Sequence, residues 1–448
     1  MKWRYFILFL GVMLFVIPTD VSAAPANSDF KDDAFYSCVI DALNESNIDG
    51  KNDRGYDYVA TDSELSQLDS LSCLEKNVTD VTGLEKMINL QGLYLSDNDI
   101  SKIDLSHNVN LEEVSLDRNQ IREIDLSHNV RLVTLDVWSN QLSEIDLRHN
   151  VNLEEVSLDR NQISEIDLSH NVGLVTLSVW HNQLSKIDLS HNRNLRELTL
   201  SDNQISKIDL SNNTSLEYLS LGDNHITFID ISMLRNLRNF YASGNQITEM
   251  KLDLNQSIKI FSISNNLIKD LQIPYSVESV EVFGNPVEVY DFTKLENLKR
   301  IAYAYETENV PTVLLPVNRT YELWRHVDST ILNTLFHSSE SDVVSIVDQD
   351  GDYYLKTLSN GSSLVTTNHP YVEPSTFQMN IKVEGTKDDT VHDGDIDQSS
   401  PDSVIEETIE NPETGIRTKD IFVSSIVMLI IGGVAYMKLK KLSKFKSM

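Results

Sequence analysis

Residues 111–131 read LEEVSLDRNQIREIDLSHNVR, and residues 132–152 repeat the same arrangement as LVTLDVWSNQLSEIDLRHNVN. The shared pattern is an aliphatic repeat, Leu-x-x-Leu-x-Leu-x-x-Asn-x-Ile-x-x-Ile-Asp-Leu, that returns every 21 residues between Leu90 and Ser257. Weaker copies begin at Leu68, Ile258, Val277 and Leu298. A fixed period of this length is typical of a solenoid, in which each repeat forms one coil and buries its apolar edge against the neighbouring coils.

The spacing inside each repeat predicts a short strand followed by a turn. Leu135 and Val137 point to the same side of the strand, and the residue between them points outward. Asn140 lies where the chain turns back toward the core, and its amide can bond the backbone of that turn. The equivalent asparagines should form a ladder, which comprises Asn98, Asn119, Asn140, Asn161, Asn182, Asn203, Asn224, Asn245 and Asn266. The sequence therefore predicts a solenoid with a curved parallel β-sheet on its concave face.

The composition limits the class of protein. With 448 residues, more than one domain is expected. The formal charge of −31 at pH 7 disfavours a nucleic-acid partner, since such binding depends on basic contacts to phosphate, and it favours a soluble surface protein. The chain has only two cysteines, which excludes a disulfide-rich scaffold.

The N-terminal part comprises two predicted segments. Residues 1–23 combine basic residues, a short apolar run and a small-residue cleavage site, which predicts a secretory signal peptide. Residues 24–67 do not follow the repeat and are predicted to form a helical cap over the open end of the solenoid, with one helix at 31–45 and a capping box at 61–64. Cys38 lies on this helix, and Cys73 lies at an inward-facing strand position of the first repeat. The two either form a disulfide or remain buried thiols.

Outward-facing positions are the ones that carry information about function. Residues 111–152 and 153–194 are identical at 35 of 42 positions, so this pair of repeats was duplicated as a unit. Aromatic and arginine side chains on a concave surface are typical anchors of a protein interface, although scattered exposed aromatics are also common. The predicted ligand-binding residues are Tyr94, Arg118, Trp138, Arg160, Trp180, Tyr218 and Tyr241. Phe283 is predicted to point outward on the same face.

Two columns of titratable residues follow the period. The histidines are predicted to be a solvated row rather than a metal or pH-sensing site, and they comprise His107, His128, His149, His170 and His191. The aspartates are predicted to bond the backbone of the turns rather than calcium, and they comprise Asp104, Asp125, Asp146, Asp167, Asp188, Asp209 and Asp230. An acidic stretch at 49–57 lacks the glycine and glutamate spacing of a calcium loop and is predicted to be a polar turn.

No catalytic constellation occurs in the sequence. It contains no Gly-rich phosphate loop, no His-Glu-x-x-His and no Gly-x-Ser-x-Gly. A repeat array also lacks a unique deep pocket. We therefore expect no enzyme activity, no catalytic or metal-binding residues and no cofactor.

The periodicity ends near residue 305. Residues 306–385 contain six strand runs separated by turn signals, which predicts a β-sandwich; the runs are 312–317, 321–325, 343–347, 353–357, 363–367 and 377–383. Residues 386–410 are acidic with almost no apolar residues, which predicts a disordered tether. Residues 421–437 are apolar or small and can just span a bilayer, and a lysine-rich tail follows them, so the repeats should lie outside the cell.

Three parts of the chain resemble known families. The helix-capped repeats resemble the leucine-rich repeats of internalin-type bacterial surface proteins, and residues 338–367 resemble a bacterial immunoglobulin-like domain of adhesins. Segment 411–448 resembles a Gram-positive cell-wall sorting signal with the pentapeptide Asn411, Pro412, Glu413, Thr414 and Gly415. That resemblance implies that a sortase cleaves after Thr414 and links it to peptidoglycan. The usual motif has leucine where this chain has Asn411, so membrane retention without cleavage stays an alternative.

Together these features predict a bacterial cell-surface binding protein that recognises a macromolecular ligand, either protein or glycan, on the concave repeat face. Before processing it would be held in the membrane by its C-terminal helix, and afterwards in the cell wall. The alternatives are a passive spacer or shield without a specific partner, and a membrane-anchored receptor-like protein. A eukaryotic receptor of this kind usually carries cysteine-rich caps, which this chain lacks.

Overall fold

The computed structural model describes residues 29–254, 257–303, 312–325, 335–338, 341–349, 352–368 and 378–384. The chain falls into two compact units that divide between Gly173 and Leu174. The predicted signal peptide, the acidic tether, the sorting pentapeptide and the predicted membrane helix all lie outside the described residues. Within the part that the structure describes, no helix has the length and apolar character needed to span a bilayer.

The first unit begins with a helical cap, as predicted. Its elements are α1 (Asp33–Glu45), η1 (Ile48–Gly50) and α2 (Asp62–Leu65). Asp32 caps α1 by accepting a hydrogen bond from the Phe35 backbone N–H at 3.0 Å, and the predicted capping box of Thr61 and Glu64 opens α2. The apolar side of α1 is fully buried at Phe35 and Val39, and the helix packs against the first strand.

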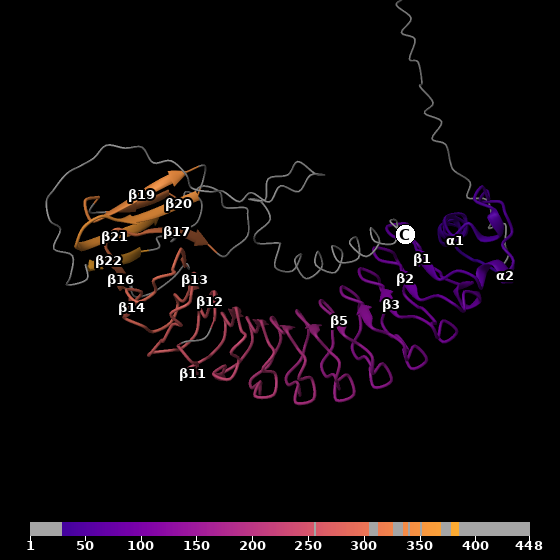
Figure 1. Ribbon diagram of the computed structural model, residues 1–448, viewed down its shortest axis with the longest axis horizontal. Helices are drawn as coiled ribbons and strands as arrows, with labels where there is room; N and C mark the ends of the chain where they lie inside the picture. Colours follow the sequence, from indigo (N-terminus) through magenta and orange to yellow (C-terminus); the bar gives the residue numbers. More distant parts are fainter. Residues whose placement is uncertain are drawn as a thin grey trace, which may run out of the picture. The chain divides into compact units, whose positions relative to one another are not determined.

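The first unit continues as a stack of short parallel strands, one in each coil. They are β1 (Ser70–Ser72), β2 (Gly92–Tyr94), β3 (Glu113–Ser115), β4 (Thr134–Asp136) and β5 (Glu155–Ser157), and η2 (Leu84–Lys86) precedes β2. Equivalent positions of successive repeats pair with each other, as Leu93 does with Val114 and Val114 with Leu135. In Figure 1 the labelled strands of this unit lie along one side of its coils.

The second unit has the same arrangement. Its repeat strands are β6 (Thr176–Ser178), β7 (Glu197–Thr199), β8 (Tyr218–Ser220), β10 (Asn239–Tyr241), β12 (Ile260–Ser262), β13 (Ser279–Glu281) and β15 (Arg300–Tyr303). They form one parallel sheet in this order. On the other side of the coils lie β9 (Phe228–Asp230), β11 (Glu249–Lys251) and β14 (Val289–Asp291), of which β9 and β11 pair in parallel.

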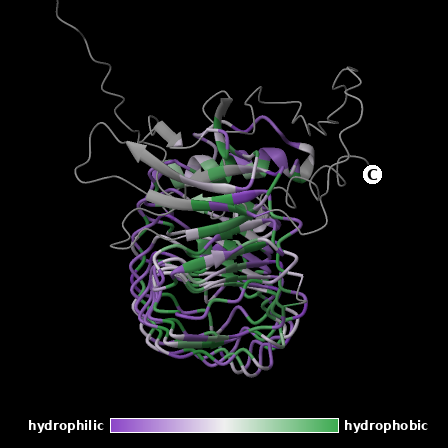
Figure 2. Ribbon diagram, turned by 90° about the vertical axis from the view of Figure 1, so that its left-hand side faces the viewer, coloured by the Kyte–Doolittle hydropathy of each residue, from purple (hydrophilic) through white to green (hydrophobic). Residues whose placement is uncertain are grey.

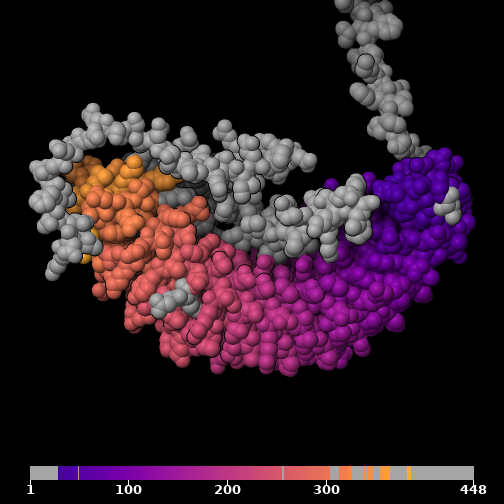
Figure 3. Space-filling model, in the orientation of Figure 1, coloured from indigo at the N-terminus to yellow at the C-terminus, as the bar shows by residue number. Residues whose placement is uncertain are grey.

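The core is filled by the aliphatic residues of the repeat. Leu132, Leu135 and Leu142 are at most 1% exposed, and the equivalent residues of other coils are buried in the same way. Hydrophobic and hydrophilic residues alternate around the coils (Figure 2). On the face seen in Figure 3, the surface of each unit is continuous from one coil to the next, which is the contact that a repeat needs because it cannot bury its edge alone.

The predicted asparagine ladder is confirmed. Asn119 donates hydrogen bonds to the carbonyls of Leu95 and Leu116 at 2.9 and 3.0 Å, and it accepts one from the Ile100 backbone N–H at 3.0 Å. The same pattern recurs at Asn140, Asn161, Asn224, Asn245 and Asn266. Each amide therefore supplies the inner turn with the partners that its backbone lacks.

A second asparagine ladder lies at the opposite turn and was not predicted. Asn129 is completely buried and donates to the carbonyls of Leu105 and Asn108, both at 3.0 Å. Asn150 does the same with Leu126 and Asn129. The two ladders together pin both turns of each coil to the coil before it.

Beyond the repeats, seven strands form two groups. They are β16 (Thr312–Pro316), β17 (Thr320–Arg325), β18 (Leu335–Ser338), β19 (Val344–Gln349), β20 (Asp352–Thr357), β21 (Gly361–Asn368) and β22 (Gln378–Glu384). Six of them match predicted strand runs within a few residues, and only β18 was missed. β17 pairs in parallel with β15 and continues into β20 and β19, whereas β16 pairs with β14 and continues into β22, β21 and β18. The parallel sheet of the repeats thus continues through β15 into β17, β20 and β19, whereas β14 begins a second sheet that is separate from the β9–β11 pair.

Candidate ligand-binding face

The surface that can hold a ligand is made by the outward positions of the parallel strands, which we call the strand face. Each repeat contributes the first and third strand residues and the two residues that follow the last inward aliphatic residue. In the β4 coil these are Thr134, Asp136, Trp138 and Ser139. The last of these positions has a left-handed backbone in most coils, as Arg118 (φ 52°) and Arg160 (φ 51°) show. This geometry projects the side chain away from the core while the next asparagine turns inward.

Tyr94 is anchored on the strand face of the first unit. Its ring lies over Gly92, where an added Cβ would meet ring atoms at about 3.0 Å. Its hydroxyl donates a 2.6 Å hydrogen bond to Glu113 on the neighbouring strand. Burial raises the pKa of the Tyr94 hydroxyl, and the bond to Glu113 raises it further, so the phenol stays protonated at neutral pH. The glycine at position 92 thus makes room for a flat aromatic surface.

Arg118 and Trp138 form a stacked pair. The guanidinium carbon of Arg118 lies 4.6 Å from the centre of the Trp138 ring, which is cation–π geometry, and its Nη1 lies 3.2 Å from the Asp97 carboxylate. Arg118 is exposed and Trp138 is half-buried. The indole Nε1–H of Trp138 is shielded and has no acceptor among the described residues. The pair presents a preorganised apolar and cationic surface on the strand face of the first unit.

Serine and aspartate side chains link the strands beside this pair. The Ser115 hydroxyl donates to Asp117 at 2.9 Å, and the Ser96 hydroxyl contacts both Ser115 and Asp117. Asp117 is only 8% exposed. These small polar residues occupy the strand-face positions that Tyr94 and Trp138 occupy in other coils, so the fold itself does not require an aromatic residue there.

The second unit presents two further aromatic groups. The rings of Trp180 and His181 lie 5.8 Å apart, and His181 contacts the carboxylate of Asp202. The rings of Tyr218 and Tyr241 lie 5.5 Å apart on adjacent strands. Burial and the charge of Glu281 raise the pKa of Tyr241 to about 12, and so this phenol is also neutral.

All seven predicted ligand-binding residues lie at strand-face positions. Six of them make the contacts described above, and Arg160 is exposed at the position equivalent to Arg118. In the first unit the structure brings Arg118 and Trp138 together and places Tyr94 on the same sheet. In the second it brings together Tyr218 and Tyr241. The aromatic residues are half-buried rather than fully exposed.

The prediction for Phe283 is wrong. Its side chain is completely buried and packs edge-to-face against Tyr290 of β14, with ring centres 5.1 Å apart. Phe292 lies next to Tyr290 in the same cluster. At this coil an aromatic core has replaced the smaller aliphatic residues of earlier repeats, and Phe283 joins it instead of facing the solvent.

Sequence reasoning missed the carboxylates that lie among the aromatic groups. Glu113 holds Tyr94, and Asp136 accepts a 3.4 Å hydrogen bond from the Trp138 backbone N–H. Glu113 is the first residue of its strand and Asp136 the third residue of its own. The repeat pattern could have predicted that both face outward, because acidic and hydroxyl residues occupy these two strand positions in successive coils. Among the described residues, no group of three or more histidine, cysteine or carboxylate side chains is arranged to hold a metal ion.

The two periodic columns adopt the predicted arrangements. Each histidine of the column is exposed, and the Nδ1 atom of His107 lies 3.1 Å from the preceding Ser106 hydroxyl. Asp104 accepts a 2.9 Å hydrogen bond from the Ser106 backbone N–H, and the equivalent bonds recur at Asp125, Asp167, Asp209 and Asp230. The aspartates therefore stabilise turns on the side away from the strand face.

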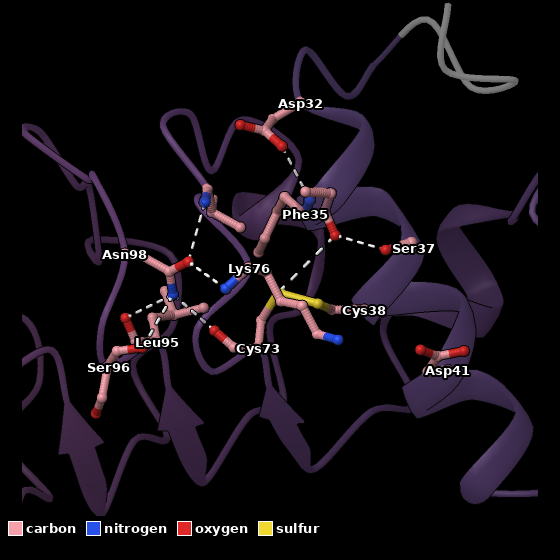
Figure 4. Close-up of a disulfide and its surroundings, with 12 residues drawn as sticks. Asp32, Phe35, Ser37, Cys38, Asp41, Cys73, Lys76, Leu95, Ser96 and Asn98 are labelled. Atoms are coloured by element: carbon pink, nitrogen blue, oxygen red, sulfur yellow. Dashed lines mark hydrogen bonds between the residues drawn. A yellow bond between two sulfur atoms is a disulfide. The ribbon is translucent and has the colours of Figure 1, made fainter. Parts of the chain in front are cut away.

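A disulfide settles the alternative left open for the cysteines. Cys38 of α1 and Cys73, which follows β1, are bonded to each other with their Cα atoms 5.5 Å apart (Figure 4). The bond fixes the cap to the first coil. Within the cap itself, the buried guanidinium of Arg54 donates to the carbonyls of Leu43 and Ile48 and to Glu64.

Comparison with known proteins agrees with this geometry. Residues 193–236 match the leucine-rich repeat family in its two-copy form. The solenoid is of the leucine-rich repeat type. No curated protein matches the sequence of this chain.

Solved leucine-rich repeat structures show the same fold. A leucine-rich repeat protein of Leptospira interrogans has a TM-score of 0.51 at 22% identity and covers 56% of this chain and 70% of its own. An internalin of Listeria monocytogenes strain 4b F2365 has a TM-score of 0.50 at 23% identity and covers 63% of this chain and 91% of its own. The functional domain of InlJ from Listeria monocytogenes covers 79% and 97%, with a TM-score of 0.48 at 20% identity. The predicted likeness to internalin repeats is confirmed at the level of the fold.

Proposed function

We propose that this chain is a bacterial surface protein that binds a protein partner with the strand face of its leucine-rich repeats. The observation that carries the proposal is the Arg118–Trp138 stack, with Tyr94 on the same sheet. Serine and aspartate fill the equivalent positions of other coils, so these aromatic side chains serve no evident purpose in folding. Tryptophan, tyrosine and arginine are the residue types that most often dominate the energy of protein interfaces.

Fixed aromatic side chains make such a face efficient. Tyr94 is held by Glu113, Trp138 is covered on one side by Arg118, and Tyr218 lies against Tyr241. A side chain that is already ordered loses little rotamer freedom when a partner docks, and so more of the contact energy appears as affinity.

The proposed place of action is the bacterial surface. The Cys38–Cys73 disulfide is typical of a protein that matures in an oxidising compartment. The order of Asn411–Gly415, the apolar segment 421–437 and the lysine-rich tail favours sorting to the cell wall, with cleavage after Thr414. Mass spectrometry of the mature C-terminus tests this step. A chain ending at Thr414 supports wall attachment, and an intact lysine-rich tail supports membrane retention instead.

Partner binding is tested by comparing matched variants. Surface proteins crosslinked to the full-length chain are identified, and the affinity of the purified partner is then measured. Trp138→Ala with Trp180→Ala should weaken binding at least about tenfold, because each removes a large interface anchor. The control is Val130→Ala with Val172→Ala, which truncates exposed apolar residues of the same repeats away from the strands and should leave affinity unchanged.

The competing proposal is a passive spacer or shield. In that case no protein would bind to the repeats through the strand face. The passive role is favoured if the double variant Trp138→Ala with Trp180→Ala binds every crosslinked protein with the same affinity as the wild type, provided that circular dichroism shows this variant and the valine control to be folded.

A further inference from the structure

The charges around the aromatic residues of the first unit are strongly one-sided. The equivalent segments 112–118, 133–139 and 154–160 of three successive coils contain seven carboxylates and two arginines. Three of these carboxylates sit on the strands themselves, at Glu113, Asp136 and Glu155. All three are half-buried on the strand face.

The register of the sheet places two of these carboxylates on either side of the β4 strand, which leads to Trp138. Glu113 and Glu155 both pair with Thr134, one from each side, so they flank the β4 strand at about 4.8 Å per strand step. Asp136 lies on β4 itself and bonds the Trp138 backbone N–H. A ligand that extends along β4 from the Trp138 ring to Thr134 therefore meets negative charge on this strand and on both of its neighbours.

The strand face already binds one cationic group of its own chain, the guanidinium of Arg118. The Arg118 guanidinium rests on the Trp138 ring at 4.6 Å while its Nη1 reaches the Asp97 carboxylate at 3.2 Å. Lysine and arginine side chains have long apolar stems and a charged head, so they can pack along an aromatic ring and place the charge on a nearby carboxylate. The combination of ring and carboxylates repeats this arrangement for side chains that come from outside.

We infer that the strand face of the first unit recognises a basic protein segment, whose lysine or arginine side chains pack on Trp138 and Tyr94 and pair with Glu113, Asp136 and Glu155. The inference rests on the proposed binding function and specifies the chemistry of its partner. Charge complementarity of this kind steers association and rejects partners of the wrong sign. An anionic ligand held by Arg118 and Arg160 is the opposite outcome of the same test.

The test uses the full-length chain and short oligolysine and oligoglutamate peptides as probes. The strand-face variant is Glu113→Gln with Asp136→Asn and Glu155→Gln. Its matched control is Glu123→Gln with Glu144→Gln and Glu165→Gln, which removes the same charge from exposed positions of the same three coils away from the strands. Glutamine at position 113 can still accept the Tyr94 hydrogen bond, so the local fold is retained.

The wild type should bind oligolysine and not oligoglutamate. Because three ion pairs with the probe are lost, the strand-face variant should raise the Kd for oligolysine about tenfold, and the control should raise it less than about twofold. Binding should also weaken steeply between low and physiological salt. Equal weakening in both variants would mean that only the net charge of the chain acts, and this would overturn the inference, as would preferential binding of oligoglutamate.

A second measurement separates this inference from the proposed function. If the partner found by crosslinking loses affinity with Trp138→Ala but keeps it with the strand-face variant, the binding function stands and the basic character of the partner is wrong. If the partner loses affinity with the strand-face variant and not with its control, both stand.

Discussion

At the scale of single residues, the buried asparagines hold successive coils together through hydrogen bonds. Asn150 is completely buried and donates to the carbonyls of Leu126 and Asn129 at 3.0 and 2.9 Å. These carbonyls belong to the preceding coil, so one amide bonds two positions of its neighbour. Asn152, two residues later, makes one bond to the Val130 carbonyl at an exposed site.

We expect Asn150→Ala to lower the free energy of unfolding by about 3 kcal/mol, because two buried carbonyls lose their donor and each costs about 1–3 kcal/mol when unsatisfied. The Oδ1 atom of Asn150 has no partner among the described residues, and its removal offsets part of this loss. Asn152→Ala, with its exposed bond, should cost less than about 1 kcal/mol. Urea unfolding followed by circular dichroism measures both, and equal midpoints for the two variants would contradict the assignment.

Single residues also mark where sequence reasoning succeeds and fails. The first ladder could be predicted at Asn119, since an asparagine three positions after an inward leucine has one obvious use. Asn129 occupies an equally regular position, but its neighbours Ser127 and His128 are polar, and the pattern resembles an exposed loop. Phe283 was assigned to the surface by its register, and only the aromatic side chain of Tyr290, seven residues later, decides that it turns inward.

At the scale of elements, local signals were enough to place most of the structure. The capping box at Thr61 and Glu64 and the apolar spacing of 31–45 fixed the cap helices, and turn residues fixed six of the strands after residue 311. Pairing between elements could not be read in this way. That β17 extends the repeat sheet through β15 depends on contacts between distant strands, which no local pattern encodes.

The disulfide between α1 and the first coil provides the element-scale prediction. It joins residues 35 positions apart, and a loop of this length should stabilise the folded cap by about 4 kcal/mol. Cys38→Ala with Cys73→Ala should therefore lower the midpoint of urea unfolding, which far-UV circular dichroism measures in all variants. In the double variant, a fluorescent label at the exposed position Tyr56→Cys also follows the unfolding of the cap. Dithiothreitol should lower the midpoint of the wild type and leave that of the double variant unchanged. An insensitive wild type would show that the bond contributes nothing.

At the scale of the whole molecule, acidic residues have two opposing effects. The formal charge of −31 destabilises any compact state by repulsion, and protonation relieves it. Many carboxyls are nevertheless more acidic when folded. Hydrogen bonds from the Ser106 hydroxyl and then its backbone N–H lower the pKa of Asp104, and related bonds lower the pKa of Asp125, Asp167, Asp209 and Asp230. Burial alone would raise the pKa of Glu64, but hydrogen bonds from Thr61 and Tyr58 outweigh it and lower the pKa to about 2.

A carboxyl whose pKa is lower in the folded state than in the unfolded state stabilises the fold above the unfolded value of about 4, and this contribution disappears as the pH falls through the folded value. The urea midpoint should therefore change little between about pH 7 and pH 5 and should fall progressively from about pH 4 toward pH 2. Ser127→Ala, which removes the hydroxyl donor to Asp125, should reduce the size of this acid-induced fall. A midpoint that rises between about pH 5 and pH 3 would mean that relief of repulsion outweighs the hydrogen bonds of the turns.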